Sequence, residues 1–176
     1  MKLTGTYRKL VKNTTINDTT LLSTDYLNHY NELVMMLEMV SDMPDMLEEV
    51  ETWQPKTYQQ HFRDSAFQHK ELAVWAYEHA PDEYREPMDD CIARMDADIS
   101  TGLPELRVLA DAGNEDRLKA EASALTGRLR GWIDTMSALI NGALDSEGYQ
   151  VRLQAEGPSE TAATVMDQSS IDALFD

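Results

Sequence analysis

The sequence predicts an all-α protein, an antiparallel four-helix bundle with an extended N-terminal arm and a flexible C-terminal tail. Apolar residues recur at helical spacing over long stretches, strand patterns are nearly absent, and proline and glycine divide the chain into helix-sized pieces. With 176 residues, the chain is long enough for one domain with a real core. The expected divisions are a basic arm over 1–22, a bundle over 23–147, a linker over 148–168 and a C-terminal docking helix over 169–176.

The first half of the bundle is predicted from caps and prolines. Residues 1–22 are rich in Thr, Asn and Lys without helical periodicity, so we expect an extended or loosely packed arm. Ser23 or Thr24 can cap the first helix, because apolar positions then follow at steps of four and three residues. These positions are Tyr26, Tyr30, Leu33, Leu37 and Val40. Pro44 and Pro55 bracket a second helix over about 45–53, and one further helical segment is expected over 56–80.

The second half is dominated by one well-patterned helix. A helix is predicted over 82–100, with Gly102 and Pro104 as an interruption before a short continuation. Asn114 is the expected N-cap of the last body helix, whose apolar residues form a heptad seam. The seam is Leu118, Ala122, Leu125, Leu129, Trp132, Met136, Leu139 and Ala143. Gly127 and Gly131 each cost about 1 kcal/mol relative to Ala, so we expect a neighbouring helix to approach closely there.

The charge of the chain restricts its partners. The formal net charge is −17, and residues 32–51 contain seven acids and no base. Such a surface repels the phosphate backbone of nucleic acids and anionic membranes, and it attracts partners with a basic patch. Acidity that serves only solubility is the alternative. The basic segment 1–13 could also fold back onto 32–51, and the sequence leaves this open.

Several site classes are disfavoured by the residues. Cys91 is the single cysteine, with apolar neighbours at helical spacing, which indicates a buried inert thiol. The chain has no Glu-x-x-His pair, no Cys/His cluster and no glycine-rich phosphate loop, so we expect neither metal nor cofactor. No apolar run approaches the ~20 residues of a membrane span, and no signal peptide is evident. We therefore expect a cytoplasmic protein without membrane insertion. Ten methionines and surplus apolar surface are compatible with a homodimer.

The last ten residues carry the most specific functional pattern. Ile171, Leu174 and Phe175 fall at positions i, i+3 and i+4, so a helix would place them on one face, with Asp172 and Asp176 opposite. One turn with three apolar residues cannot build a core. Its expected use is docking in a groove of another protein, and a frayed terminus is the alternative.

This terminal segment resembles a known recognition peptide. The matching residues are Gln168, Ser169, Ser170, Ile171, Asp172, Ala173, Leu174 and Phe175. They resemble the peptide with which the flagellar switch protein FliM docks on the phosphorylated response regulator CheY, although Ser170 stands where an acid is usual. The CheZ phosphatases end in a related acidic helix behind a linker. The resemblance implies binding of a CheY-like receiver through Ile171, Asp172, Ala173, Leu174 and Phe175, and a place in chemotaxis or two-component signalling.

The resemblance also implies a candidate activity, dephosphorylation of the receiver. CheZ proteins use an Asp-x-x-x-Gln pair, in which the amide orients water and the acid holds a receiver lysine. Asp64 and Gln68 form the only such pair here and are the candidate catalytic residues. Asp25 and Asn28 resemble the acid-x-x-Asn pair of the CheC and CheX phosphatases. In contrast, the stretch 124–128 matches the Leu-Thr-Gly of the CheZ catalytic helix but lacks both catalytic residues.

Two other functions remain open from the sequence. The acidic bundle could be a non-enzymatic scaffold or adaptor. It could also be a histidine phosphotransfer domain, a four-helix bundle with an exposed His near a Lys, for which His69 and Lys70 are the candidates. In such domains the Lys usually follows three residues after the His, a position that Leu72 occupies here.

Overall fold

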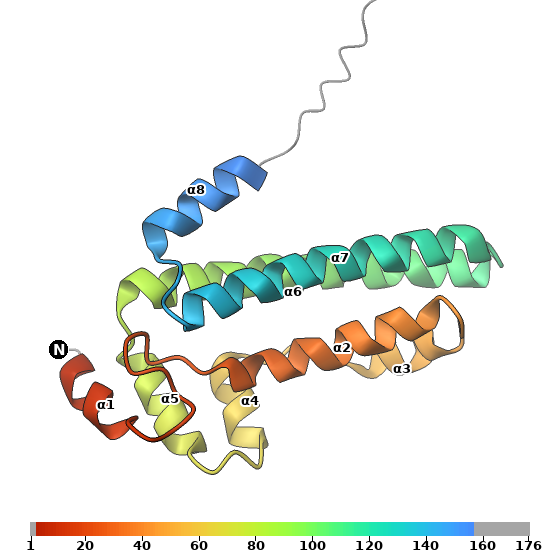
Figure 1. Ribbon diagram of the computed structural model, residues 1–176. Helices are drawn as coiled ribbons and strands as arrows, with labels where there is room; N and C mark the ends of the chain where they lie inside the picture. Colours follow the sequence, from red (N-terminus) through yellow and green to blue (C-terminus); the bar gives the residue numbers. More distant parts are fainter. Residues whose placement is uncertain (1–2, 157–176) are drawn as a thin grey trace, which may run out of the picture.

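The computed structural model describes residues 3–156 (Figure 1). Within them the chain forms eight α-helices, one 3-10 helix and no strand, which confirms the all-α class. The helices are α1 (Thr4–Leu10), η1 (Thr24–Tyr26), α2 (Leu27–Val40), α3 (Met46–Thr52), α4 (Tyr58–Asp64), α5 (Lys70–Glu78), α6 (Asp82–Asp111), α7 (Glu115–Ile140) and α8 (Ser146–Glu156). None of these helices combines the length and the apolar character that a membrane span needs.

Two helix pairs make up the body of the molecule. The long helices α6 and α7 are joined by a short turn and lie side by side along their length (Figure 1). The shorter pair α2 and α3 lies against them, with α2 on α7 and α3 on α6. Helices α4, α5 and α1 gather at the end where α6 begins, and α8 packs on α6 after the chain leaves α7. The core therefore lies between the two pairs and extends under α4 and α5.

The predicted start of the first body helix is confirmed. Ser23 is the N-cap of η1, and its hydroxyl accepts a hydrogen bond from the backbone N–H of Asp25. The 3-10 turn runs directly into α2. The five apolar positions expected to face inward are all buried: Tyr26, Tyr30, Leu33, Leu37 and Val40. This single stripe explains why α2 can lie against both α3 and α7.

The heptad seam of α7 is confirmed over most of its length. The side chain of Asn114 accepts a hydrogen bond from the N–H of Arg117, as expected of an N-cap. Six seam residues are buried: Leu118, Ala122, Leu125, Leu129, Met136 and Leu139. Trp132 is partly buried, while Ala143 lies beyond the end of the helix and is exposed.

The expectation about the glycines of this helix is wrong. Within the described chain, a Cβ at Gly127 or Gly131 would meet no heavy atom within 4 Å, so no neighbouring helix approaches there. The close approach occurs on the partner helix instead. A Cβ at Gly102 of α6 would lie 2.9 Å from Cδ2 of Leu125. Gly102 thus makes room for a seam leucine of α7.

The predicted interruption of α6 is also wrong, because one helix spans Asp82–Asp111 with Pro87 and Pro104 inside it. Proline removes a backbone hydrogen bond and disfavours a helix interior. Here burial of Ile99, Gly102 and Leu106 against the rest of the body outweighs that cost. Tertiary packing of one face commonly dominates helix stability over intrinsic propensity.

The segment predicted as one helix over 56–80 forms two. Thr57 caps α4 in a reciprocal capping box with Gln60, and α4 ends at Asp64. Ser65 has extended backbone, its hydroxyl donates to the carbonyl of Phe62, and its Oγ accepts from the N–H of Phe67. This local hydroxyl bonding competes with helix continuation, as serine often does.

The N-terminal arm is not extended, since α1 occupies Thr4–Leu10. The segment after it is packed as well, because Val11, Ile16, Leu21 and Leu22 are buried. Their irregular spacing explains why no helical or strand period marked them as core. The hydroxyl of Thr20 donates to the carbonyl of Ile140 at 2.6 Å, which ties this segment to the end of α7.

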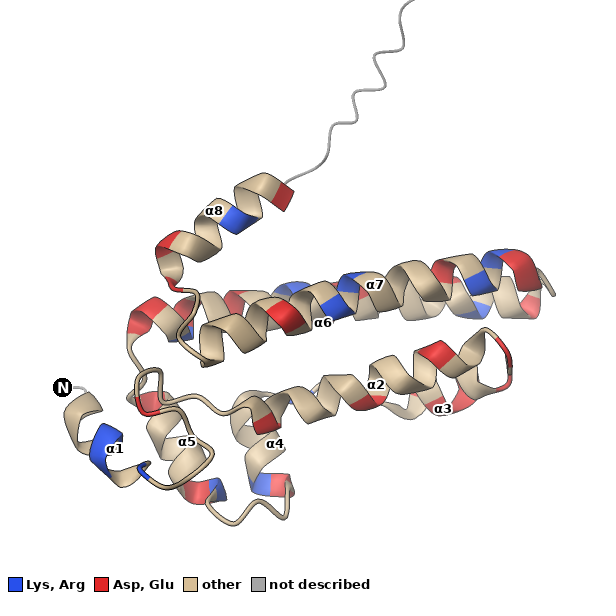
Figure 2. Ribbon diagram, viewed as in Figure 1, with Lys and Arg blue, Asp and Glu red and all other residues tan. Residues whose placement is uncertain are grey.

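The arm also does not fold back onto the acidic segment. Figure 2 shows the basic residues of α1 at the end of the molecule opposite the connection between α2 and α3. Instead, Thr4 donates to the carbonyl of His79, and Tyr7 stacks on the His79 ring with the ring centroids 4.4 Å apart. The arm therefore covers the end of α5.

The prediction of a linker is wrong for residues 148–156, because they lie in α8; residues 157–168 of it lie outside the described residues. Tyr149 is its one buried residue, and the Tyr149 hydroxyl donates to Oδ2 of Asp90 at 2.7 Å. Arg152 donates to Oγ1 of Thr135 at 3.1 Å. A helix held by one aromatic anchor and polar contacts has no apolar stripe, so periodicity did not reveal it.

Alanine substitutions at Gly131 and Gly102 test this packing. Gly131→Ala should raise the free energy of unfolding by about 0.5–1 kcal/mol, because the site is open and alanine favours helix. Gly102→Ala should be less stable than Gly131→Ala by about 1 kcal/mol or more, because Leu125 must shift. Urea unfolding measures both values. Equal stabilisation by the two changes would contradict the close packing of Leu125 on Gly102.

Candidate functional site

The predicted docking residues Ile171, Asp172, Ala173, Leu174 and Phe175 lie outside the described residues. The described chain ends at Glu156 in α8, and residues 157–168 separate it from the docking segment in the sequence. The candidate site on the body of the molecule is therefore built from the other predicted pair, Asp64 and Gln68.

Asp64 and Gln68 do not lie one turn apart on a helix. Asp64 is the last residue of α4, and Gln68 is an exposed residue of the turn before α5. The extended backbone at Ser65 separates them. Nζ of Lys56 forms an ion pair with Oδ2 of Asp64 at 3.1 Å. The spacing expected for a CheZ-like pair is thus absent, while both side chains remain accessible.

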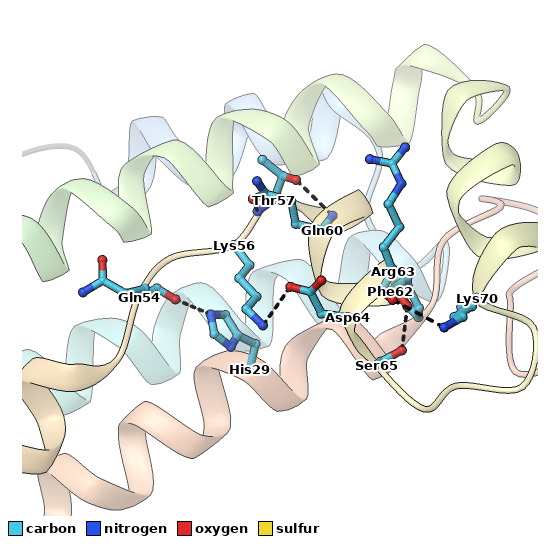
Figure 3. A network of polar contacts seen from close by, with 10 residues as sticks. All are labelled: His29, Gln54, Lys56, Thr57, Gln60, Phe62, Arg63, Asp64, Ser65 and Lys70. Atoms are coloured by element: carbon cyan, nitrogen blue, oxygen red, sulfur yellow. Dashed lines mark hydrogen bonds and ion pairs between the residues drawn. The ribbon is translucent and has the colours of Figure 1, made fainter.

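Asp64 lines a polar cavity of about 220 Å³ between α2 and α4. The lining residues are Asn28, His29, Glu32, Lys56, His61, Asp64 and Ser65. Figure 3 shows His29 projecting from α2 toward the Lys56–Asp64 pair, with α4 on the far side. One residue of each predicted pair lines the cavity: Asn28 of the Asp25–Asn28 pair and Asp64 of the Asp64–Gln68 pair.

His29 is held in one orientation. Its Nε2 lies 2.7 Å from the carbonyl oxygen of Gln54, which can only accept, so Nε2 carries the proton and donates. The ring stacks on Trp53 with centroids 4.5 Å apart, and the Trp53 indole N–H donates to the carbonyl of His29. In the neutral imidazole, Nδ1 is then a free acceptor on the ring edge.

His61 comes from α4 and lies close to His29, with ring centroids 6.0 Å apart. Burial lowers the pKa of His29 and of His61, and in both cases it is the largest influence. The ammonium of Lys56 acts in the same direction on both rings. Both imidazoles are therefore mainly neutral at pH 7.

Two buried tyrosines in contact with each other make hydrogen bonds next to the cavity. The Tyr26 hydroxyl donates to the carbonyl of Lys56 at 2.8 Å and lies 3.1 Å from the Tyr30 hydroxyl. Tyr30 donates in turn to Oδ1 of Asp96 at 2.9 Å, which links α2 to α6. Burial raises the pKa of the Asp96 carboxyl. The hydrogen bond from Tyr26 fixes the backbone of Lys56 at the edge of the cavity.

Asp25 and Asn28, the other predicted pair, have different surroundings. Oδ2 of Asp25 accepts hydrogen bonds from the hydroxyls of Thr15 and Ser23, both at 2.9 Å. Asp25 therefore fixes the start of α2. Asn28 is exposed and faces the cavity. Of the two predicted pairs, the amide of Asn28 and the acid of Asp64 share one site.

Cys91, His69 and Lys70 lie outside the cavity. Burial raises the pKa of the Cys91 thiol to about 12, which agrees with an inert core residue. His69 lies at the start of α5 with its ring 6.2 Å from that of Phe67, and Lys70 donates to the carbonyl of Arg63. Among the described residues, no group of three His, Cys, Asp or Glu side chains is placed to hold a metal ion.

Sequence reasoning did not find the cavity itself. The pairing of His29 with His61 joins residues from separate helices, and no local spacing indicates such a contact. The sequence did contain a pattern that predicts the start of α4, which borders the cavity. Thr57 and Gln60 have the Ser/Thr-x-x-Glu/Gln spacing of a capping box. Reading it would have placed the start of α4 and the neighbouring Lys56.

The histidines of the cavity predict a pH dependence of stability. Because the pKa values of both histidines are lowered in the folded protein, these residues bind more protons in the unfolded chain, and their contribution to the free energy of unfolding should fall as the pH drops below about 6.5. Glu32, Asp25 and Asp96 oppose this trend more weakly. His29→Gln combined with His61→Gln should flatten the fall in unfolding free energy.

Denaturant unfolding at a series of pH values between 5 and 7.5 measures this effect. The single variant His69→Gln, outside the cavity, controls for loss of a histidine elsewhere. An equally steep fall in the double cavity variant and the wild type would show that the two rings are not desolvated.

The chain was also compared with known proteins. No protein-family model, curated protein or solved structure matches it. Inference of function therefore depends on the residues of this chain.

Proposed function

We propose that this protein docks a CheY-like receiver through its C-terminal peptide and acts as a regulator in chemotaxis or two-component signalling. The observation that carries the proposal is the pattern of residues 168–175, with Ile171, Leu174 and Phe175 at helical spacing. A receiver partner implies a cytoplasmic location. We further propose that α2, α3, α6 and α7 act as an antiparallel four-helix body, alone or as a homodimer.

The energetics of such a peptide favour a reversible complex. Burial of Ile171, Leu174 and Phe175 is worth ~1.5–3 kcal/mol for each side chain. Ordering of the peptide and loss of its freedom consume much of this gain. The expected dissociation constant is therefore micromolar. Asp172 is expected to face a basic residue of the receiver, and contact between the body and the receiver would increase the affinity through avidity.

Dephosphorylation of the receiver is the activity that we propose to follow docking. Asp64 is the candidate acid, and it is accessible although it pairs with Lys56. Exposed ion pairs are worth only about 0–1 kcal/mol, so a receiver lysine can replace Lys56 at little cost. The amide that orients water would come from Gln68, the residue predicted from the sequence. Asn28 is a second candidate because it lines the same cavity as Asp64.

A non-enzymatic adaptor is the alternative that a specific observation favours. The break of the helix at Ser65 removes the one-turn spacing of Asp64 and Gln68. In that case the body only tethers the docking peptide. Histidine phosphotransfer through His69 has no further support from its surroundings, where its neighbour Lys70 contacts the carbonyl of Arg63.

Substitution of the anchors tests the docking proposal. Ile171→Ala and Phe175→Ala should each weaken binding to a CheY-like receiver by about 2 kcal/mol, which is roughly 30-fold, because buried anchors dominate such interfaces. Calorimetric titration of receivers, with and without beryllofluoride as the phosphoryl mimic, measures the change. Val165→Ala removes similar apolar surface outside the peptide and should leave affinity unchanged. Wild-type affinity in both anchor variants would refute the proposal.

Phosphate release tests the activity separately. The full chain should accelerate dephosphorylation of a receiver that it binds, and Asp64→Asn should abolish most of that acceleration without changing affinity. Gln68→Ala and Asn28→Ala, compared side by side, identify which amide orients water. Binding without any acceleration by the wild-type chain would establish the adaptor and exclude the phosphatase.

A further inference from the structure

One face of α2 and of the turn after it carries three exposed methionines. The side chains of Met35, Met39 and Met43 are 64%, 44% and 47% exposed. The N–H of Met43 donates to the carbonyl of Met39 at 2.9 Å, so the turn after α2 holds Met43 next to the end of the helix. Met35 and Met39 lie one helical turn apart, about 6 Å along the axis, and Met43 follows them in the turn. We refer to these three residues as the methionine row.

The opposite face of α2 is already used by the core. Leu33, Leu37 and Val40 are fully buried against the rest of the body. Single exposed apolar residues are common on protein surfaces and need no explanation. Three long apolar side chains in a row along one helix and the turn after it are a larger and continuous feature. Methionine adapts its shape to different partners, so it is frequent on surfaces that bind helices.

Acidic residues flank the methionine row. Glu32, Glu38 and Asp42 lie three or four residues from a methionine of the row, so they share its side of the helix. The sequence contains no Lys or Arg over residues 13–55. Figure 2 shows α2 and α3 with acidic residues and no basic ones. The row therefore lies in a field that attracts cations.

Most acidic residues of the segment 32–51 are not ion-paired within the described chain. Glu38 pairs with Arg130 of α7. Five others make no ion pair with another residue of the described chain. These are Glu32, Asp42, Asp45, Glu48 and Glu49. If the acidic residues served only to bind α7, they would lie against its arginines. Most of them are instead exposed to solvent.

We propose that the methionine row and the acids around it dock a basic amphipathic helix of a partner protein. The apolar side of such a helix covers Met35, Met39 and Met43, while its Lys or Arg residues face Glu32 and Asp42. The charge of the segment speeds encounter with a basic partner and excludes acidic ones. This surface is separate from the C-terminal peptide, which is itself acidic and would be repelled from it.

A methyl-labelled titration of the full chain tests this surface. The probe is a synthetic peptide of about 16 Leu and Lys residues with Leu at i, i+3, i+4 and i+7, long enough to form a helix on binding. The ε-methyl resonances of Met35, Met39 and Met43 should shift, and those of the buried Met88 and Met95 should not. Met35→Gln combined with Met39→Gln should weaken binding by about tenfold or more. Val151→Gln, an exposed apolar residue of α8, is the matched control.

Each outcome decides the proposal. Binding that needs the methionine row and weakens with added salt supports it. Equal binding of a scrambled Leu/Lys peptide would reveal general charge attraction and overturn it. Loss of binding in Val108→Gln, with wild-type affinity in the methionine variant, would place the peptide in the groove that Trp53, Leu103 and Val108 line beside α6, and would overturn it. Shifts of the row on concentrating the protein alone would identify a second copy as the occupant, which also overturns it.

Discussion

Packing of α7 against α6 and α2 is the interaction on which the other parts depend. The seam of α7 meets both neighbours, and Leu125 reaches Gly102 closely enough to leave no room for a side chain there. Gly102 and Leu106 are buried on either side of Pro104, within the single helix α6. The part of α6 before Pro104 supplies Asp96 to Tyr30 and Asp90 to Tyr149, and these hydrogen bonds tie α2 and α8 to α6. The apolar seam of α7 thus positions α6, which makes these hydrogen bonds to α2 and α8.

The sequence could predict what depends on regular spacing. The cap at Ser23, the stripe of α2 and the seam of α7 all follow from local patterns, and all are confirmed. The errors have two causes. Tertiary packing keeps Pro104 inside a helix and holds α8 through Tyr149 and polar contacts, and local bonding of the Ser65 hydroxyl ends α4. The cavity of His29 and His61 was not predicted, because it joins residues from two helices whose packing no single stretch of sequence encodes.

The molecule presents three chemically different surfaces. The cavity of His29, His61 and Asp64 is small and polar, with its imidazoles mainly neutral at pH 7. The methionine row is apolar with an acidic surround, on the face of α2 opposite the core. The C-terminal peptide is acidic with three apolar anchors and follows α8 in the sequence. In the function that we propose, the peptide would serve recognition of a receiver and the cavity would serve the chemistry. The methionine row is then left for a second, basic partner.

The central claim is that residues 168–176 are the docking element. Amide spectra of the ¹⁵N-labelled full chain, recorded while an unlabelled CheY-like receiver with beryllofluoride is added, test it most directly. We expect the resonances of Ile171, Leu174 and Phe175 to shift first and furthest, and those of the buried seam of α7 to stay in place. Saturable shifts confined to the body, with the C-terminal resonances unchanged, would contradict the claim.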